Sequence, residues 1–229
     1  MVLKRASERV WYTAYEEERD RPALGYIKGD KFSVAVDAGH SGTHVREFYE
    51  ALQREGLPLP LITVITHWHW DHSFGMHAVN GATAANSRTD QYLREAAERI
   101  GREGTDWFFA MDESIQKEYA DGQEVKVVPA DCVFQHERGI DIGGAAVIMF
   151  QTISPHTDDC TLVWVPQEKV LFLGDACGGE FPSWEVDPGK MKLLVNSIQM
   201  TDADICIPGH SEAVKREELL QTLKTEGQI

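Results

Sequence analysis

Residues 61–72 read LITVITHWHWDH, and this stretch decides how the rest of the chain is interpreted. Its first half, Leu61–Thr66, is a run of apolar and β-branched residues that is typical of a buried β-strand. In an extended segment alternate residues point to the same side, and a turn near the end can present a second pair of side chains. The second half therefore predicts a metal site, with four possible ligands: His67, His69, Asp71 and His72.

Three more possible ligands occur later in the chain. His156 lies in SPHTDD, Asp175 in LGDA and His210 in IPGH, each directly after a run of residues that predicts a strand. Residues that follow strands gather at one edge of a sheet, so we expect these side chains to lie beside the histidines of residues 61–72.

In order and in strand context these residues resemble the ligand series of the metallo-β-lactamase superfamily. The likeness covers nearly the whole chain and includes VDAG at Val36–Gly39, which resembles the first loop of that family. It implies an α/β fold, a four-layer αββα sandwich of two mixed sheets flanked by helices. We expect a single domain over residues 1–229, with a helical insertion at about 89–120.

The resemblance also implies that these residues share two divalent metal ions, with Asp175 as the bridge between them. The ligands of one ion would be His67, His69 and His156. The ligands of the other would be Asp71, His72 and His210.

Two aspartates have further roles on the same likeness. Asp37, in VDAG, is expected to brace the metal-binding loop without contacting an ion. Asp71 is the expected catalytic residue, because it could orient a hydroxide held between the ions or pass its proton to the leaving group.

Imidazole and carboxylate ligands without a thiolate suit zinc, and they also suit manganese or iron. We expect two zinc ions, because mixed His and Asp sites fit the low coordination number and redox-silent chemistry of zinc. A hydroxide between such ions forms near neutral pH and attacks an electrophilic carbon or phosphorus.

The presence of Asp rather than Cys at position 175 also indicates which class of substrate to expect. Many zinc β-lactamases have a Cys at the matching position, whereas an Asp is the pattern of glyoxalase II, lactonase and phosphodiesterase relatives. The leading hypothesis is therefore hydrolysis of a small-molecule ester, thioester, lactone or amide, and antibiotic hydrolysis is not the expected native activity. The nearby Cys177 is expected to be a small structural residue.

Several other functions remain open from the sequence. A phosphodiesterase would use the same two ions. An oxidoreductase of the persulfide dioxygenase type would use one iron and would not need Asp71, His72 and His210 to bind a second ion. Flavodiiron proteins typically carry a Glu where this chain has His69. An RNA-processing enzyme and a non-catalytic metal-binding module are the remaining alternatives.

Composition narrows the partners. The chain of 229 residues has a formal net charge of −15, which disfavours nucleic acid and anionic membranes and favours a small-molecule substrate. A secretory signal and an apolar span of about 20 residues are both missing from the pattern, and the four cysteines are widely spaced, so we expect a cytoplasmic protein with reduced thiols. A homodimer is possible.

The remaining pattern predicts strands, helices, strands and helices in that order. An N-terminal meander is expected over residues 10–37 and a helix over 45–54. Two amphipathic helices should form the insertion, and hairpins should follow between residues 140 and 174. Helices are expected near 191–198 and 219–223.

Aromatic and histidine residues outside the ligand series have less specific expectations. Trp68 and Trp70 would pack beneath the metal loop or face the substrate, with core packing favoured. The aromatic insertion could form a substrate wall, core or a dimer surface. Four other histidines have no motif partner, and most of them are expected at the surface, although His40 could reach the pocket mouth: His40, His44, His77 and His136.

Overall fold

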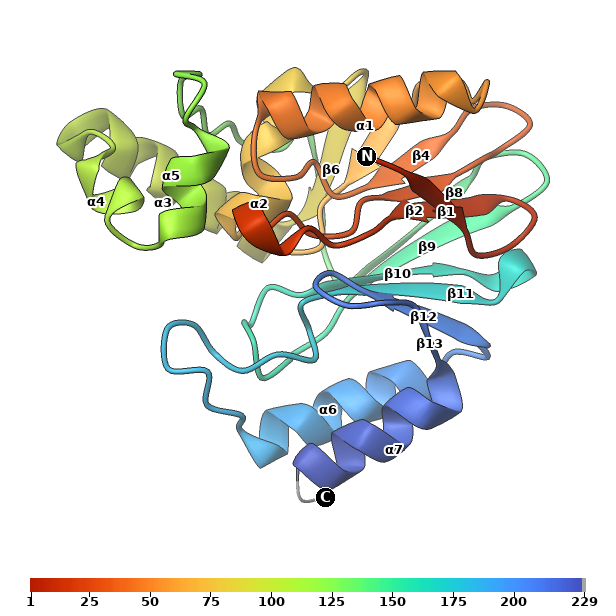
Figure 1. The fold of residues 1–229 in the computed structure, drawn as a ribbon. Coiled ribbons are helices and arrows are strands. Elements are labelled where there is room, and N and C mark those ends of the chain that lie inside the picture. The colour runs from red at the N-terminus through yellow and green to blue at the C-terminus, as the bar shows by residue number, and fades with distance from the viewer. Residues whose placement is uncertain (228–229) are drawn as a thin grey trace.

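Two β-sheets pack face to face, and helices cover their outer faces, so that the layers run helix, sheet, sheet, helix (Figure 1). The computed structural model describes residues 1–227. Helix α1 (Gly42–Arg54) lies on the first sheet, and α6 (Pro188–Gln199) and α7 (Arg216–Glu226) lie on the second. This is the α/β sandwich of two mixed sheets that the sequence predicts.

The first sheet has seven strands that are adjacent in chain order. Its first four strands form an antiparallel meander and its last four pair in parallel. The strands are β1 (Leu3–Arg5), β2 (Val10–Thr13), β3 (Gly25–Ile27), β4 (Val34–Val36), β5 (Ile62–Val64), β6 (Ala82–Asn86) and β7 (Cys132–Phe134).

The second sheet has six strands in the order β13-β12-β11-β10-β9-β8. Strands β8 to β11 form the expected antiparallel hairpins, and β11 pairs in parallel with β12. The strands are β8 (Glu137–Asp141), β9 (Ala146–Gln151), β10 (Thr161–Val165), β11 (Val170–Gly174), β12 (Ile205–Pro208) and β13 (Val214–Lys215).

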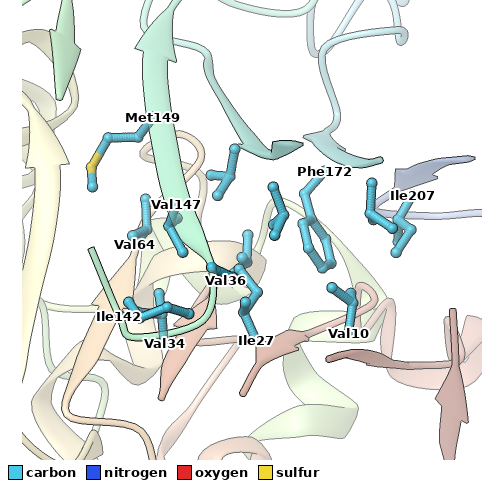
Figure 2. Close-up of a cluster of buried hydrophobic side chains, with 14 of the residues drawn as sticks. Val10, Ile27, Val34, Val36, Val64, Ile142, Val147, Met149, Phe172 and Ile207 are labelled. Atoms are coloured by element: carbon cyan, nitrogen blue, oxygen red, sulfur yellow. The ribbon is translucent and has the colours of Figure 1, made fainter. Parts of the chain in front are cut away.

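The main core lies between the two sheets (Figure 2). Strand β11 shows why its sequence is apolar throughout. Phe172 faces the first sheet in this core, while Leu171 and Leu173 pack on the other face with side chains of α6 and α7. A strand covered on both faces has no reason to alternate apolar and polar residues.

The helical segment that was expected as an insertion, called the insertion below, extends from one end of the sandwich (Figure 1). It contains α3 (Ser87–Glu103), α4 (Asp106–Phe109) and α5 (Glu113–Glu118). The second long helix expected there is instead two short ones, because the Asp112 side chain accepts a hydrogen bond from the Ser114 amide and starts a new helix.

Short elements complete the chain: α2 (Trp70–Ser73) and the 3₁₀ turns η1 (Glu17–Arg19), η2 (Phe74–Ala78) and η3 (Pro166–Glu168). Among residues 1–227, none of the helices is long and apolar enough to cross a membrane.

Candidate metal centre

The ends of four strands deliver the bracing residue Asp37 and six of the seven predicted ligand residues to one place, and His156 joins them from the loop after β9. Asp37 follows β4, and the HWHWDH segment begins three positions after the end of its parallel neighbour β5. In the second sheet Asp175 follows β11, and His210 follows the parallel strand β12. Parallel strands end at the same edge of a sheet, so each sheet contributes side chains to a shared site between them.

The HWHWDH segment is held by hydrogen bonds that leave its histidine rings free to face the site. The Ser73 hydroxyl donates to the carbonyl oxygens of Trp68 and His69, at 2.7 and 2.9 Å. The Trp68 amide donates to Asp159 Oδ2 at 2.9 Å. Helix α2 begins at Trp70, which turns Asp71 and His72 away from the direction of the two preceding histidines.

Three buried imidazoles form the first ligand group, His67, His69 and His156. One ligand nitrogen from each ring lies within 4.8 Å of the others. His156 Nε2 and His69 Nδ1 are 2.9 Å apart. The His156 ring is oriented by its Nδ1, which lies 2.8 Å from the carbonyl oxygen of Gly179.

The second ligand group combines carboxylates with imidazoles and consists of Asp71, His72, Asp175 and His210. His210 Nε2 lies 3.0 Å from Asp71 Oδ2 and 3.4 Å from His72 Nε2. The ligand atoms of this group also lie within 4.8 Å of one another.

Asp175 lies between the two groups. Its Oδ1 is 3.2 Å from His72 Nε2, and its Oδ2 is 3.2 Å from His210 Nε2. The same Oδ2 lies 3.7 Å from Nε2 of His156, which belongs to the first group. A carboxylate placed in this way can contact two ions at once.

Asp37 occupies the bracing position expected for it. Its side chain accepts hydrogen bonds from the Thr66 amide and hydroxyl, at 2.7 and 2.8 Å. The His72 Nδ1 lies 2.7 Å from Asp37 Oδ2, so the carboxylate orients the ring with Nε2 toward the site.

The two groups differ in charge. Burial lowers the pKa of His67 well below its usual value and lowers that of His69 to about 3. Burial also lowers the pKa of His72, but the neighbouring carboxylates, Asp175 first, outweigh it and raise that pKa well above its usual value. The pKa of His210 is raised in the same way against burial, mainly by Asp175.

The residues present fit metal ions. His67 Nε2 is buried and has no hydrogen-bond partner among the described residues, although a buried polar atom is normally paired. Gly209 precedes His210, and any Cβ there would collide with Asp175 Oδ1 and the His72 ring. Seven side chains converge, and each offers a carboxylate oxygen or an imidazole nitrogen as a ligand atom. These are the ligand atoms of zinc, manganese and iron sites.

A pocket of about 460 Å³ opens over both groups. Its aromatic lining comes from Tyr15, Trp70, Phe181 and Trp184. Its carboxylates beyond the ligand groups are Asp20 and Asp112, and Lys and Arg are missing from the lining formed by the described residues.

The two tryptophans of the motif differ in role. Trp68 packs against the core clusters below the loop, whereas Trp70 is buried and also lines the pocket. The Trp70 ring contacts Phe108 of the insertion at a centroid distance of 6.2 Å. Cys177 also lines the pocket.

Two of the four remaining histidines lie in the interior, which corrects the expectation from the sequence. His40 and His44 are fully buried, not at the surface, because the turn before α1 hydrogen-bonds to Gly75 of η2 and packs against Tyr119. His77 and His136 are exposed as expected.

Three further residues around the site were not predicted from the sequence. Asp159 holds the motif through the Trp68 amide, and Asp20 contacts Nδ1 of His210 at 3.1 Å. Tyr15 packs against His210 with ring centroids 4.9 Å apart. The second Asp of HTDD was the one visible signal for Asp159, and Asp20 and Tyr15 lie in a segment that carries no motif.

Residues 23–210 match the family model described as the metallo-beta-lactamase superfamily. This chain belongs to that superfamily. Its members are mostly hydrolases and typically bind metal ions. The match begins just after the segment that carries Tyr15 and Asp20 and ends at His210.

Solved structures with the same fold include β-lactamases and a sulfatase. A metallo-beta-lactamase from Pontibacter korlensis has 19% identity and a TM-score of 0.72, with 99% of this chain and 98% of that chain covered. A metallo-beta-lactamase from Hirschia baltica has 18% identity and a TM-score of 0.68, covering 98% and 96%.

A stereoselective inverting sec-alkylsulfatase from Pseudomonas sp. has 16% identity and a TM-score of 0.73, with 99% of this chain but 41% of that chain covered. No curated protein matches the sequence. At these identities the likeness shows the fold and leaves the substrate open.

Proposed function

We propose that this protein is a binuclear metal-dependent hydrolase that cleaves a small-molecule ester, thioester, lactone or amide. The observation that carries this proposal is the position of Asp175. Its two oxygens face His72 in one ligand group and His156 in the other, so a single carboxylate would join two ions. Zinc is the proposed metal, and manganese or iron fits the same donors.

Two bound divalent ions would supply an ionised water near neutral pH and polarise the bond to be cleaved. The protein's own residues set the geometry around that chemistry. Asp71 is buried, and its Oδ2 lies 3.0 Å from His210 Nε2, on the floor of the pocket. Asp71 is therefore proposed to hold a proton between the attacking water and the leaving group.

The aromatic lining is proposed to bind the apolar part of the substrate and to exclude water. Phe181 lies against Trp70 with ring centroids 5.3 Å apart, and Trp184 stacks on the His156 ring at 6.3 Å. Both rings come from the loop after Asp175, so the strand that delivers the proposed bridge also carries part of the substrate wall.

The charge of the lining argues for a neutral or cationic substrate. β-Lactam antibiotics carry a carboxylate, and the lining formed by the described residues offers Asp20 and Asp112 but neither Lys nor Arg to pair with it. This supports an ester, thioester or lactone over an antibiotic, although neighbours of the same fold are named β-lactamases.

A mononuclear iron oxidoreductase is disfavoured by the second ligand group. Such an enzyme needs one ion, yet Asp71, His72 and His210 converge as closely as the three histidines of the first group. Holding this many buried ionisable groups together costs stability unless they serve a site.

The test is metal content together with a substrate panel. Protein stripped with a chelator and reloaded with zinc should contain about two ions per chain and should hydrolyse at least one of a set of chromogenic esters, thioesters and lactones. Phosphodiesters and a cephalosporin complete the panel. His136→Ala, at an exposed position, is the control and should behave as the parent. A stoichiometry near one would reject the binuclear proposal.

A further inference from the structure

A segment outside every motif reaches the second ligand group from the N-terminal side. Asp20 is the C-cap residue directly after the 3₁₀ turn η1, and its Oδ1 lies 3.1 Å from His210 Nδ1. The Tyr15 hydroxyl lies 3.2 Å from the same Oδ1 of Asp20, and the Tyr15 ring packs on His210. The contacts enclose the side of the His210 ring that faces away from the other ligands.

This contact determines which nitrogen of His210 is available as a ligand. With Nδ1–H donating to Asp20, Nε2 is left with its lone pair pointing at Asp71 and Asp175, at 3.0 and 3.2 Å. His72 has the matching arrangement, because its Nδ1 meets Asp37. Each of the two histidines in the second group is therefore oriented by a carboxylate that is not itself in either ligand group.

Asp20 is itself fixed by a buried ion pair that joins this segment to the insertion. The next residue, Arg21, is 1% exposed and contacts both carboxylate oxygens of Glu118, at 2.6 and 2.9 Å. Glu118 is the last residue of α5 and is 3% exposed. It also accepts a hydrogen bond from Ser41, the residue that caps α1.

The turn around Asp20 is closed on itself as well. Glu16 and Arg21 exchange two backbone hydrogen bonds, at 3.0 and 2.9 Å. The Asp20 backbone is left-handed, with φ of 50°, a conformation that Asp and Asn adopt more readily than most residues. A shift of Arg21 would therefore move Asp20 as part of the same turn.

We propose that Asp20 is a positioning residue for His210, and that the insertion keeps it in place through the Glu118–Arg21 pair. The insertion then supports the second metal ion rather than acting on substrate choice alone. This inference rests on the proposed two-ion centre. It assigns the two ions different sensitivities: the ion at His67, His69 and His156 is independent of Asp20, whereas the ion at His210 depends on it.

The experiment measures the affinity of each ion for the full chain, with zinc competed against a chromophoric chelator and cobalt absorption as a second readout. Asp20→Ala should weaken the ion held by the His210 group by about 10–100-fold and alter its cobalt spectrum, leaving the ion at His67, His69 and His156 unchanged. Asp20→Asn suits the same backbone and keeps a hydrogen-bond acceptor, so its effect should be smaller. Glu118→Gln should weaken the same ion.

Asp30→Ala is the matched control, because Asp30 is an exposed carboxylate paired with Arg9 in the same N-terminal region but outside the pocket. Melting of the metal-free proteins separates misfolding from a local effect. Equal affinities for both ions in Asp20→Ala and the parent, or equal loss at both, would overturn the inference while leaving the two-ion proposal intact. A parent protein that binds one ion would overturn the proposed function instead.

Discussion

The two ligand groups differ in the contacts that orient their histidine rings. The His67, His69 and His156 group consists of imidazoles whose outer contacts are a hydroxyl and a backbone carbonyl. The His72 and His210 rings instead rest against carboxylates on both sides. The first group therefore depends mainly on the path of the backbone, and the second depends on side-chain charges that substitutions can remove one at a time.

The strongest test of this difference is to substitute Asp175, the residue proposed to bridge the two ligand groups. Asp175→Ala should abolish binding of the second ion and weaken the first, and it should lower kcat/KM by about a thousandfold, since losing the metal's contribution costs several kcal/mol. Asp175→Asn keeps the shape of the side chain but loses its charge. Its metal content and its kcat/KM should lie between those of Asp175→Ala and the parent. Metal analysis and hydrolysis assays measure both effects.

His210→Ala is the comparison variant for Asp175. It should remove one ion and leave the three-histidine group loaded, because the ligand residues that His210 contacts in the described structure are Asp71, His72 and Asp175. If Asp175→Ala held two ions and turned over at the parent rate, Asp175 would not be the bridge.

A smaller effect is expected from the carboxylate that orients His72. Asp37→Asn should lower kcat/KM and the affinity of the second ion by roughly 10–100-fold, the usual cost of losing a residue that orients a metal-binding histidine. The first ion should stay bound, and zinc competition would resolve the two. Equal weakening of both ions would contradict the division between the groups.

The pocket wall above the first group should matter less. Trp184 is 62% exposed and stacks on His156, so Trp184→Ala should raise KM by roughly fivefold, corresponding to about 1 kcal/mol of aromatic contact, with metal content unchanged. Trp107→Ala is the control, since Trp107 packs against Arg99 and does not line the pocket. A larger rise in KM for Trp107→Ala than for Trp184→Ala would indicate that the insertion forms part of the substrate wall.

The smallest expected effect concerns substrate charge near the second group. A neutral substrate should have a kcat/KM higher by up to roughly fivefold than an isosteric one with a carboxylate, because a solvent-exposed charge interaction is worth about 0–1 kcal/mol. Raising the salt concentration should reduce the difference. Preference for the carboxylate would show that the proposed metal ions, or a cation outside the lining, bind the substrate carboxylate.

Features that depend on neighbouring residues could be predicted from the sequence, and contacts between positions far apart in the chain could not. The seven residues of the two groups follow strands or lie within six positions of each other, so local pattern was enough to propose them. Strand β6 reads ATAAN and was missed, because small residues give no apolar periodicity even though most of them are buried. Asp20 meets His210 through the fold alone, since no local pattern links positions so far apart in the chain.

The burial of individual histidines could not be predicted from the local sequence either. His40 and His44 lie near a glycine turn and the start of a helix, which is typical of surface positions, but tertiary packing encloses both. The split of the expected second helix of the insertion at Asp112 likewise reflects a capping contact that outcompeted the apolar spacing.

The order of the ligands along the chain has a consequence for how the centre forms during synthesis. At about 5–20 residues per second, His67, His69 and His72 leave the ribosome seconds before His156, and His210 follows several seconds later. The three-imidazole group can therefore close first, on a chain that has not yet produced strand β12. On the two-ion proposal, a newly made molecule would pass through a stage that can hold a single ion, and the availability of metal at that moment would decide which metal binds there.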